Sequence, residues 1–197
     1  FEFARFCHIS QNISEKNFRY GLHFMFSDND IYTNNIFRNN GTGVAVMYTK
    51  GIRMTGNIFA DNWGSSAYGI LLKDIGDSYI TGNTFINNTV GIFMEGSSRI
   101  NVTGNSFQNN GWALKLLANC AQDTFIRNKF NGNTFDVSTN GTVTLNYFKH
   151  NYWDKYTGYD LNRDGIGDIP YRPVSLYATI IEQMPYAVML LRSFAVD

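Results

Sequence analysis

The sequence has little charge and no long hydrophobic run. Charged residues make up 16% of the chain, and its 16 Lys and Arg balance its 16 Asp and Glu. A zero net charge argues against a nucleic-acid-binding protein, which is normally basic. Because no run reaches the roughly 18 apolar residues that a membrane helix needs, we expect a chain that does not itself span a membrane.

Cysteine and proline are also sparse. The two cysteines, Cys7 and Cys120, are too few for a disulfide framework, and the three prolines all lie after residue 169. No signal-peptide pattern opens the chain, whose first residue, Phe1, stands within a strand-like segment. We therefore expect a fragment or a processed product of a longer protein.

What the sequence does have is a repeat rich in asparagine, glycine and aromatic residues. Four similar segments carry phenylalanine at intervals of 22, 26 and 22 residues, at Phe37, Phe59, Phe85 and Phe107. Looser copies continue at Phe130 and Phe148. Within each unit, as in GVAVMY, the pattern alternates with period two. Fixed periods of about 20–50 residues indicate stacked units, so we predict an all-β fold, a parallel β-helix of about 22 residues per rung.

Turn residues recur at equivalent places in the units. TGN stands at 55–57, 81–83 and 103–105, and TNN stands at 33–35. Gly or Asn at the middle position tolerates the positive φ that a sharp corner needs. The third residues are expected to form a ladder whose amides bond from rung to rung; they are Asn35, Asn57, Asn83 and Asn105.

The repeat also separates the two cysteines. Cys7 and Cys120 lie about five rungs apart, or roughly 24 Å at about 4.8 Å per rung. A disulfide tolerates Cα separations of only about 4.4–6.8 Å. We therefore predict that the two are not bonded to each other.

A histidine and two methionines are predicted on one outer face. The residues one and three after the glycine of GLHFM and GVAVM are apolar in every unit, so alternation directs the residues two and four after it outward. His23 and Met25 then lie about 6.5–7 Å apart along a strand, and Met47 lies one rung, about 4.8 Å, from Met25. Glu2 aligns beneath Met25.

These three side chains suit copper. Thioethers select Cu(I), and imidazole is compatible with it, so His23, Met25 and Met47 are candidate copper ligands. The alternative is that the methionines merely cover an apolar outer patch. Because thioethers do not titrate, only His23 should weaken copper binding in acid, near its usual pKa of about 6.5.

After residue 151 the repeat stops, and residues 152–174 contain a loop that resembles the start of a calcium-binding loop. Its pattern D-x-N-x-D-G offers oxygen ligands at the first, third and fifth positions. The candidate ligands are Asp160, Asn162, Asp164, the Ile166 carbonyl and Asp168. The glutamate that would end such a loop is replaced by Tyr171, so an ion-free turn is the alternative.

Residues 175–197 are predicted to be a helical segment. Apolar residues recur at helical spacing at Leu176, Ile180, Met184, Val188 and Leu191. Ser175 is a candidate N-cap, and Pro185 should kink or split the helix. The segment either covers the open end of the repeat, whose last rung would be a sticky edge, or docks on a partner through Met184, Val188 and Leu191.

Together these motifs resemble the C-terminal two-thirds of the NosD family. The resemblance rests on GLHFM, GVAVMYTKGIRMTGN, NWGSSAYGILLK, NGWALKLLANC and GYDLNRDGIGDIPYRP, and it covers nearly the whole chain. It implies a right-handed β-helix in the periplasm that passes Cu(I) toward the copper-sulfide cluster of nitrous oxide reductase. It also implies partners: an ABC-type ATPase with its membrane permease, and a membrane-anchored copper chaperone lipoprotein. The family proteins begin earlier, with a signal sequence and further rungs.

Two other classes of protein use such solenoids. A carbohydrate enzyme would need several acidic or basic residues on one outer groove, for instance two carboxylates that flank a glycosidic bond. The outward columns here hold mainly Met, Ala, Leu and Phe, and Lys73 and Glu95 are placed to pair with each other across rungs. We therefore expect no enzyme. A structural or adhesive solenoid is the third possibility.

Overall fold

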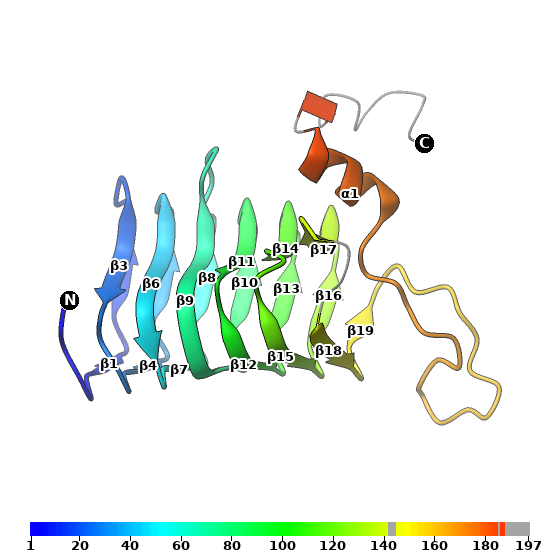
Figure 1. The fold of residues 1–197 in the computed structure, drawn as a ribbon, viewed down its shortest axis with the longest axis horizontal. Coiled ribbons are helices and arrows are strands. Elements are labelled where there is room, and N and C mark those ends of the chain that lie inside the picture. Colours follow the sequence, from blue (N-terminus) through cyan, green and yellow to red (C-terminus); the bar gives the residue numbers. More distant parts are fainter. Residues whose placement is uncertain (142–144, 185, 188–197) are drawn as a thin grey trace.

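The chain forms a right-handed parallel β-helix with one short helix near its C-terminus, as predicted. The computed structural model describes residues 1–141, 145–184 and 186–187. The rungs stack side by side from the N-terminal end to the last yellow strands, and α1 (Leu176–Gln183) lies at the C-terminal end of the stack (Figure 1). Every pairing between the strands is parallel and joins one rung to the next; the first of them is between β1 and β4.

Each rung contributes strands to three faces. The first face consists of β3 (Tyr20–Met25), β6 (Thr42–Lys50), the first half of β9 (Tyr68–Thr81), β11 (Val90–Glu95), β14 (Trp112–Leu116) and β17 (Phe135–Thr139). The second face consists of β1 (His8–Ser10), β4 (Ile31–Thr33), β7 (Arg53–Thr55), the second half of β9, β12 (Ser98–Thr103), β15 (Ala121–Ile126) and β18 (Leu145–Lys149). The third face consists of β2 (Ile13–Glu15), β5 (Ile36–Arg38), β8 (Ile58–Ala60), β10 (Thr84–Ile86), β13 (Ser106–Gln108), β16 (Lys129–Asn131) and β19 (Tyr152–Trp153).

A column of stacked aromatic rings fills the interior behind the third face. The rings of Phe37, Phe59, Phe85, Phe107, Phe130 and Trp153 follow one another with centroids 4.2–5.4 Å apart. The expectation that Phe148 continues this column is wrong. Phe148 lies on β18 and stacks on Phe125 of β15, because the last unit has one strand more before the aromatic residue that continues the column, Trp153.

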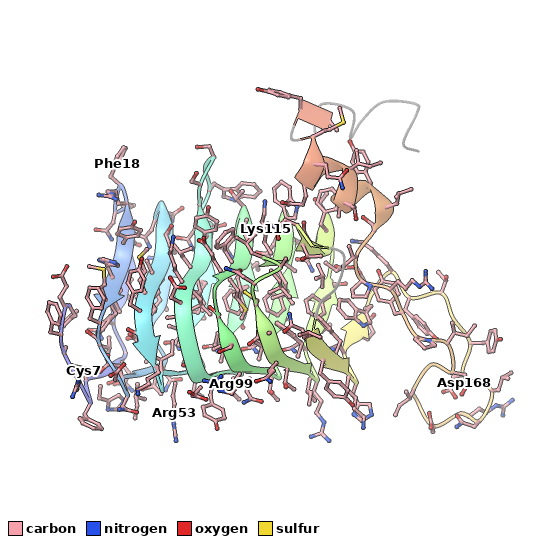
Figure 2. All side chains as sticks on the ribbon, in the orientation of Figure 1. Cys7, Phe18, Arg53, Arg99, Lys115 and Asp168 are labelled. Carbon is pink, nitrogen blue, oxygen red and sulfur yellow. The ribbon has the colours of Figure 1, made fainter. Side chains whose placement is uncertain are left out.

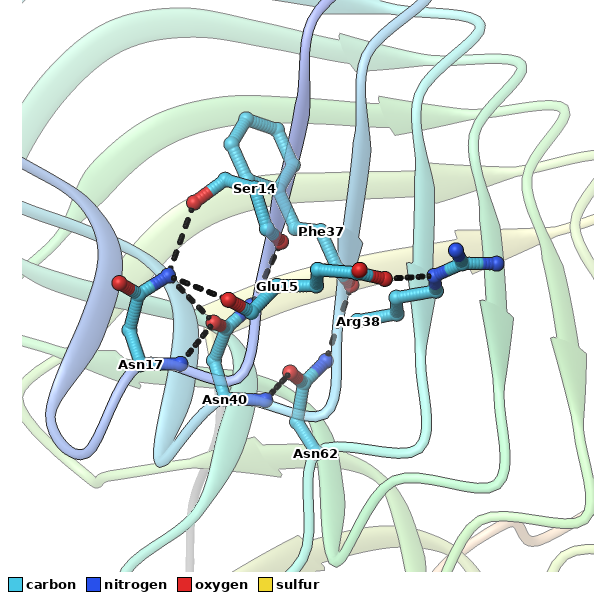
Figure 3. Close-up of polar contacts among 7 residues, drawn as sticks. All are labelled: Ser14, Glu15, Asn17, Phe37, Arg38, Asn40 and Asn62. Carbon is cyan, nitrogen blue, oxygen red and sulfur yellow. Dashed lines mark hydrogen bonds and ion pairs between the residues drawn. The ribbon is translucent and has the colours of Figure 1, made fainter.

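Two asparagine ladders bind the rungs together. The predicted ladder is present, and it extends to Asn12 at one end and to Asn128 and Asn151 at the other. A second ladder, five residues further along each rung, consists of Asn17, Asn40, Asn62, Asn88, Asn110 and Asn133. Figure 3 shows its first members, where the Nδ2 of Asn17 donates to the Oδ1 of Asn40 over 2.9 Å. The sequence analysis missed this ladder, although each NxFxxN segment carries its signal.

The corners follow the predicted turn chemistry. The middle residues of the TNN and TGN motifs all take positive φ, at 53° for Asn34, 66° for Gly56, 63° for Gly82 and 65° for Gly104. These are left-handed conformations that Gly and Asn adopt at low cost.

The helix α1 packs on the outer side of β17. Ser175 caps it as predicted and accepts a hydrogen bond from the backbone N–H of Ala178. Ala178 and Ile181 are buried against Phe135, and the carboxylate of Glu182 accepts hydrogen bonds from Lys115 and Ser138. The helix ends at Gln183, and Pro185 lies outside the described residues.

The segment before the helix, rather than the helix itself, meets the last rung. Val174 bridges to Val137 in parallel, and the ring of Tyr171 lies 5.0 Å from that of Trp153. The helix face predicted from Leu176, Ile180 and Met184 is therefore not the packed one. Their exposed fractions are 79%, 39% and 64%, because the residues two and five positions after Leu176 point at β17 instead.

The ladders predict a large and specific cost for losing one rung's amide. The Oδ1 of Asn83 accepts from the backbone N–H and the Nδ2 of Asn57, and its Nδ2 donates to the Met54 carbonyl and to the Oδ1 of Asn105. Asn83→Ala leaves several of these buried groups unpaired, so we expect a loss of about 2–4 kcal/mol in the free energy of unfolding by urea. Asn101→Ala, a half-buried position on β12, is the control. A loss for Asn83→Ala no larger than that of the control would contradict the structural role of the ladder.

Candidate metal-binding site

Strand alternation places the three candidate copper ligands on the outer side of the first face. Phe24, Val44 and Val46 point inward and are fully buried. His23, Met25 and Met47 alternate with them on β3 and β6, and all three are partly exposed. The structure thus confirms the facing that the sequence predicted, although it contains no ion with which to test ligation.

The register brings the two methionines into one column. Met25 lies directly opposite Met47 in the parallel pairing of β3 with β6. Glu2 bridges to Met25 on one side, and Met47 pairs with Lys73 on the other. The column therefore reads carboxylate, thioether, thioether, ammonium, with adjacent members one rung apart.

A small residue opens space beside His23. The residue opposite His23 in β6 is Ala45, which is fully buried although it points outward. Larger outer side chains must therefore close over its methyl group, and its neighbours in the pairing and along the strand are His23, Leu71 and Met47. The imidazole and the Met47 thioether thus border the same shallow depression above Ala45.

His23 sits in surroundings that favour a neutral ring. Its imidazole stacks on Tyr20, with centroids 5.0 Å apart and planes 23° from parallel. Burial lowers the pKa of His23, and the carboxylate of Glu2 opposes this only in part. Its Nε2 is buried and has no hydrogen-bond partner, a state that costs free energy and that a metal ion would relieve. The sequence analysis did not identify Tyr20, whose only signal is an aromatic residue before the glycine, shared with Tyr68.

Harder donors do not offer a competing site. Within residues 1–141, 145–184 and 186–187, no three His, Cys, Asp or Glu side chains gather as a metal-binding group. A copper site in this part of the chain therefore needs methionine sulfur. His8, on the second face, has its Nε2 2.7 Å from the Thr33 hydroxyl, and Cys7 and Cys120 are both free thiols, as predicted.

The calcium expectation finds no support. The carboxylate of Asp160 accepts the backbone N–H groups of Asp164 and Gly165. Asp164 accepts from Ile166, and Asp168 from Leu161. These oxygens therefore fold the loop through its own backbone instead of converging on a common point, and Asn162 only joins the same network.

The predicted docking residues are only partly visible. Met184 is described and exposed, whereas Val188 and Leu191 lie outside the described residues. In the part of the chain that the structure covers, no helix is long and apolar enough to cross a membrane.

Comparison with known proteins gives a family and a fold. Residues 1–158 match the model of the family described as "Periplasmic copper-binding protein (NosD)". Among solved structures, the chain is similar to the periplasmic alginate epimerase AlgG, with 19% identity and a TM-score of 0.62 over 74% of this chain and 39% of that one. The A-module of the mannuronan C-5 epimerase AlgE6 from Azotobacter vinelandii gives 12% identity and a TM-score of 0.54, over 77% of this chain and 56% of the module. No curated protein matches the chain significantly.

These solved structures set limits on the comparison. At such low identity the likeness shows the β-helix alone and says nothing of the outer face. The chain also spans less than half the length of AlgG, so the activity of that protein is not carried over.

The burial of His23 predicts an unusual titration. We expect its imidazole in the folded protein to gain a proton only below the ordinary pKa of about 6.5, as followed by NMR, because burial disfavours the charged ring. Folding stability should accordingly be full above about pH 6.5 and fall as the pH drops toward the lowered pKa, because the unfolded chain then binds the proton more readily.

Tyr20 provides the matched variants. Tyr20→Ala uncovers the imidazole and should raise the pKa of His23 toward its ordinary value, whereas Tyr20→Phe keeps the stacked ring and should preserve the lowered pKa. A pKa at or above the ordinary value in the unsubstituted protein would show that the ring is not desolvated.

Proposed function

The chain belongs to the NosD family of periplasmic copper-binding proteins, and we propose that it holds Cu(I) on the outer side of its first face through His23, Met25 and Met47. The observation that carries this assignment is the buried, unpartnered Nε2 of His23 on the strand that also presents Met25. Across the rung, Met25 is paired with Met47. One nitrogen and two sulfur donors then come from two adjacent strands whose register is fixed.

The donor set suits an ion that must be passed on. Thioether sulfur favours Cu(I) over harder cations, and none of the three proposed ligands carries a thiolate that would hold it irreversibly. The lowered pKa of His23 keeps its nitrogen free of a proton at neutral pH. Its acid-dependent loss of copper should therefore lie below the pH near 6.5 that an ordinary histidine would give, which corrects the sequence-based expectation.

The next rung ends the donor column. Lys73 follows Met47, and its ammonium group lies 3.3 Å from the carboxylate of Glu95 on the rung after it. A cation repels Cu(I), so the ion would be confined to the rungs before Lys73. Glu2 bounds the column on its other side with a carboxylate, which attracts a cation.

We further propose that this chain relays copper and does no chemistry on it. In this proposal the protein works in the periplasm, receives Cu(I) from a copper chaperone lipoprotein and serves the assembly of the copper-sulfide cluster of nitrous oxide reductase, together with an ABC-type ATPase and permease. The family membership supports the copper and the periplasm; the partners rest on the sequence resemblance. The Lys73–Glu95 ion pair argues against a carbohydrate enzyme, because two groups that neutralise each other make a poor acid and base.

The copper proposal predicts a large effect of two outward methionines. In competition with a Cu(I) chelator at neutral pH and without oxygen, a Met25→Ala, Met47→Ala double variant should lose most of its Cu(I) affinity, by roughly 100-fold or more if each sulfur contributes about 1.4 kcal/mol. The fold should persist, because both side chains lie on the outer side.

Lys73→Ala, one rung further on, is the control and should change Cu(I) affinity little. Circular dichroism verifies that the double variant is folded. An unchanged affinity in the folded double variant would mean that the two methionines are ordinary surface cover.

The exposed side of α1 predicts a contact with the permease. Leu176 and Met184 present apolar surface that neither the solenoid nor the helix covers, and such surface is typical of an interaction site. Leu176→Glu with Met184→Glu should abolish co-purification with the permease while Cu(I) affinity is retained. Gln183→Glu, an exposed polar position on the same helix, controls for added charge. Full co-purification of the double variant would refute docking through this surface.

A further inference from the structure

A hollow of about 440 Å³ lies on the outside of the solenoid at the corner between the first and second faces. Its walls include Asn29, Lys50, Gly51, Arg53, Asp77 and Tyr79. The hollow spans three successive rungs, since Ile31, Arg53 and Tyr79 pair in register across β4, β7 and β9. None of the proposed copper ligands lines it.

A missing side chain creates the hollow. By that register, Asn29, Gly51 and Asp77 occupy one corner column, and all three have left-handed φ, at 60°, 72° and 50°. The rungs on either side of Gly51 carry side chains at this corner. A Cβ at Gly51 would collide with the Oδ1 of Asn29, so the rung without a side chain is the floor of the cavity.

The walls carry uncompensated positive charge. Among the ion pairs of the described residues, neither Lys50 nor Arg53 has a carboxylate partner. The carboxylate of Asp77 is already engaged by Arg99, at 2.6 and 2.9 Å. This hydrogen bonding lowers the pKa of Asp77, and the charge of Lys50 lowers it further. Three cations therefore surround one carboxylate, and Arg53 and Arg99 lie along the same lower edge of the solenoid in Figure 2.

Arg53 is also held in place. Its guanidinium lies over the ring of Tyr79, 5.6 Å from the centroid, an arrangement that restricts the long side chain before any ligand arrives. An ordered cation loses less conformational entropy when it binds an anion. The hollow thus combines space, net positive charge and a positioned planar donor.

We propose that this hollow binds an oxyanion group, a carboxylate or a phosphate, with Arg53 and Lys50 as its two cationic contacts. The guanidinium fork suits two oxygens of one carboxylate or phosphate, and the ammonium group adds a point charge. The exposed rings and aliphatic carbon of Tyr79 and Ile31 line the same hollow, which gives an organic anion such as a sugar acid an apolar surface to rest on. The site is independent of copper.

The test measures binding of inorganic phosphate, glucuronate and uncharged glucose by calorimetry or NMR at about 10 mM ionic strength, where charge is weakly screened. We expect at least one of the two anions to bind and glucose not to bind. Arg53→Gln and Lys50→Gln should each weaken binding about tenfold, and added salt should weaken it further. Lys129→Gln is the matched control, because the ammonium of Lys129 lies over the ring of Tyr152, also at 5.6 Å, outside the hollow.

The outcomes separate the two sources of the oxyanion. Binding of phosphate as well as glucuronate means that charge alone selects the ligand, and binding of glucuronate alone means that the apolar wall contributes. Absence of binding by both anions at millimolar concentrations would overturn the proposal. Binding that survives in an Arg53→Gln, Lys50→Gln double variant, or that falls equally in Lys129→Gln, would also overturn it.

Discussion

The hydrogen bond from one asparagine amide to the amide of the next rung is the interaction on which the rest of this structure depends. In the buried ladder, the Oδ1 of Asn57 accepts both the backbone N–H and the Nδ2 of Asn35. A rung displaced by one residue would break both bonds and leave buried polar groups unpaired, at a cost of about 1–3 kcal/mol for each group. The ladders therefore fix the register of every pair of rungs, and the stacked phenylalanines behind them favour the same register.

A fixed register is what makes outer columns meaningful. Because side chains alternate strictly along a strand, a slip of one residue would move Met47 to the interior and bring an apolar core residue outside. With the register held, Met25 faces Met47 on the first face, and Gly51 falls between Asn29 and Asp77 at the corner. The copper column and the oxyanion hollow are thus two consequences of one structural repeat, produced by substitutions at positions that the repeat leaves free.

The part of the fold that follows from periodicity could be predicted from the sequence. The phenylalanine spacing and the TGN corners gave the β-helix, the first asparagine ladder and the outward direction of His23, Met25 and Met47. The last unit was harder, because no spacing rule shows that Phe148 belongs to the second face and that Trp153 continues the aromatic column.

Features that depend on contacts outside the repeat could not be predicted in this way. The helical spacing of Leu176, Ile180 and Met184 is genuine, yet a different side of α1 is packed, because Glu182 reaches Lys115 and Ser138 on the first face. The stacking of Tyr20 on His23 likewise depends on side-chain directions within one strand. For the Asp-rich loop, the ligand pattern alone did not show that its carboxylates would be engaged by backbone N–H groups.

The unpaired nitrogen of His23 connects stability with function. A buried polar atom without a partner lowers the stability of the folded state, and the stacked Tyr20 that buries this ring also lowers the pKa of His23. A solvated histidine would be easier to fold, but it would be protonated more readily in mild acid and would then repel Cu(I). In our proposal the local cost keeps a neutral nitrogen available beside two thioethers, and the rigid stack of rungs beneath provides the stability that offsets it.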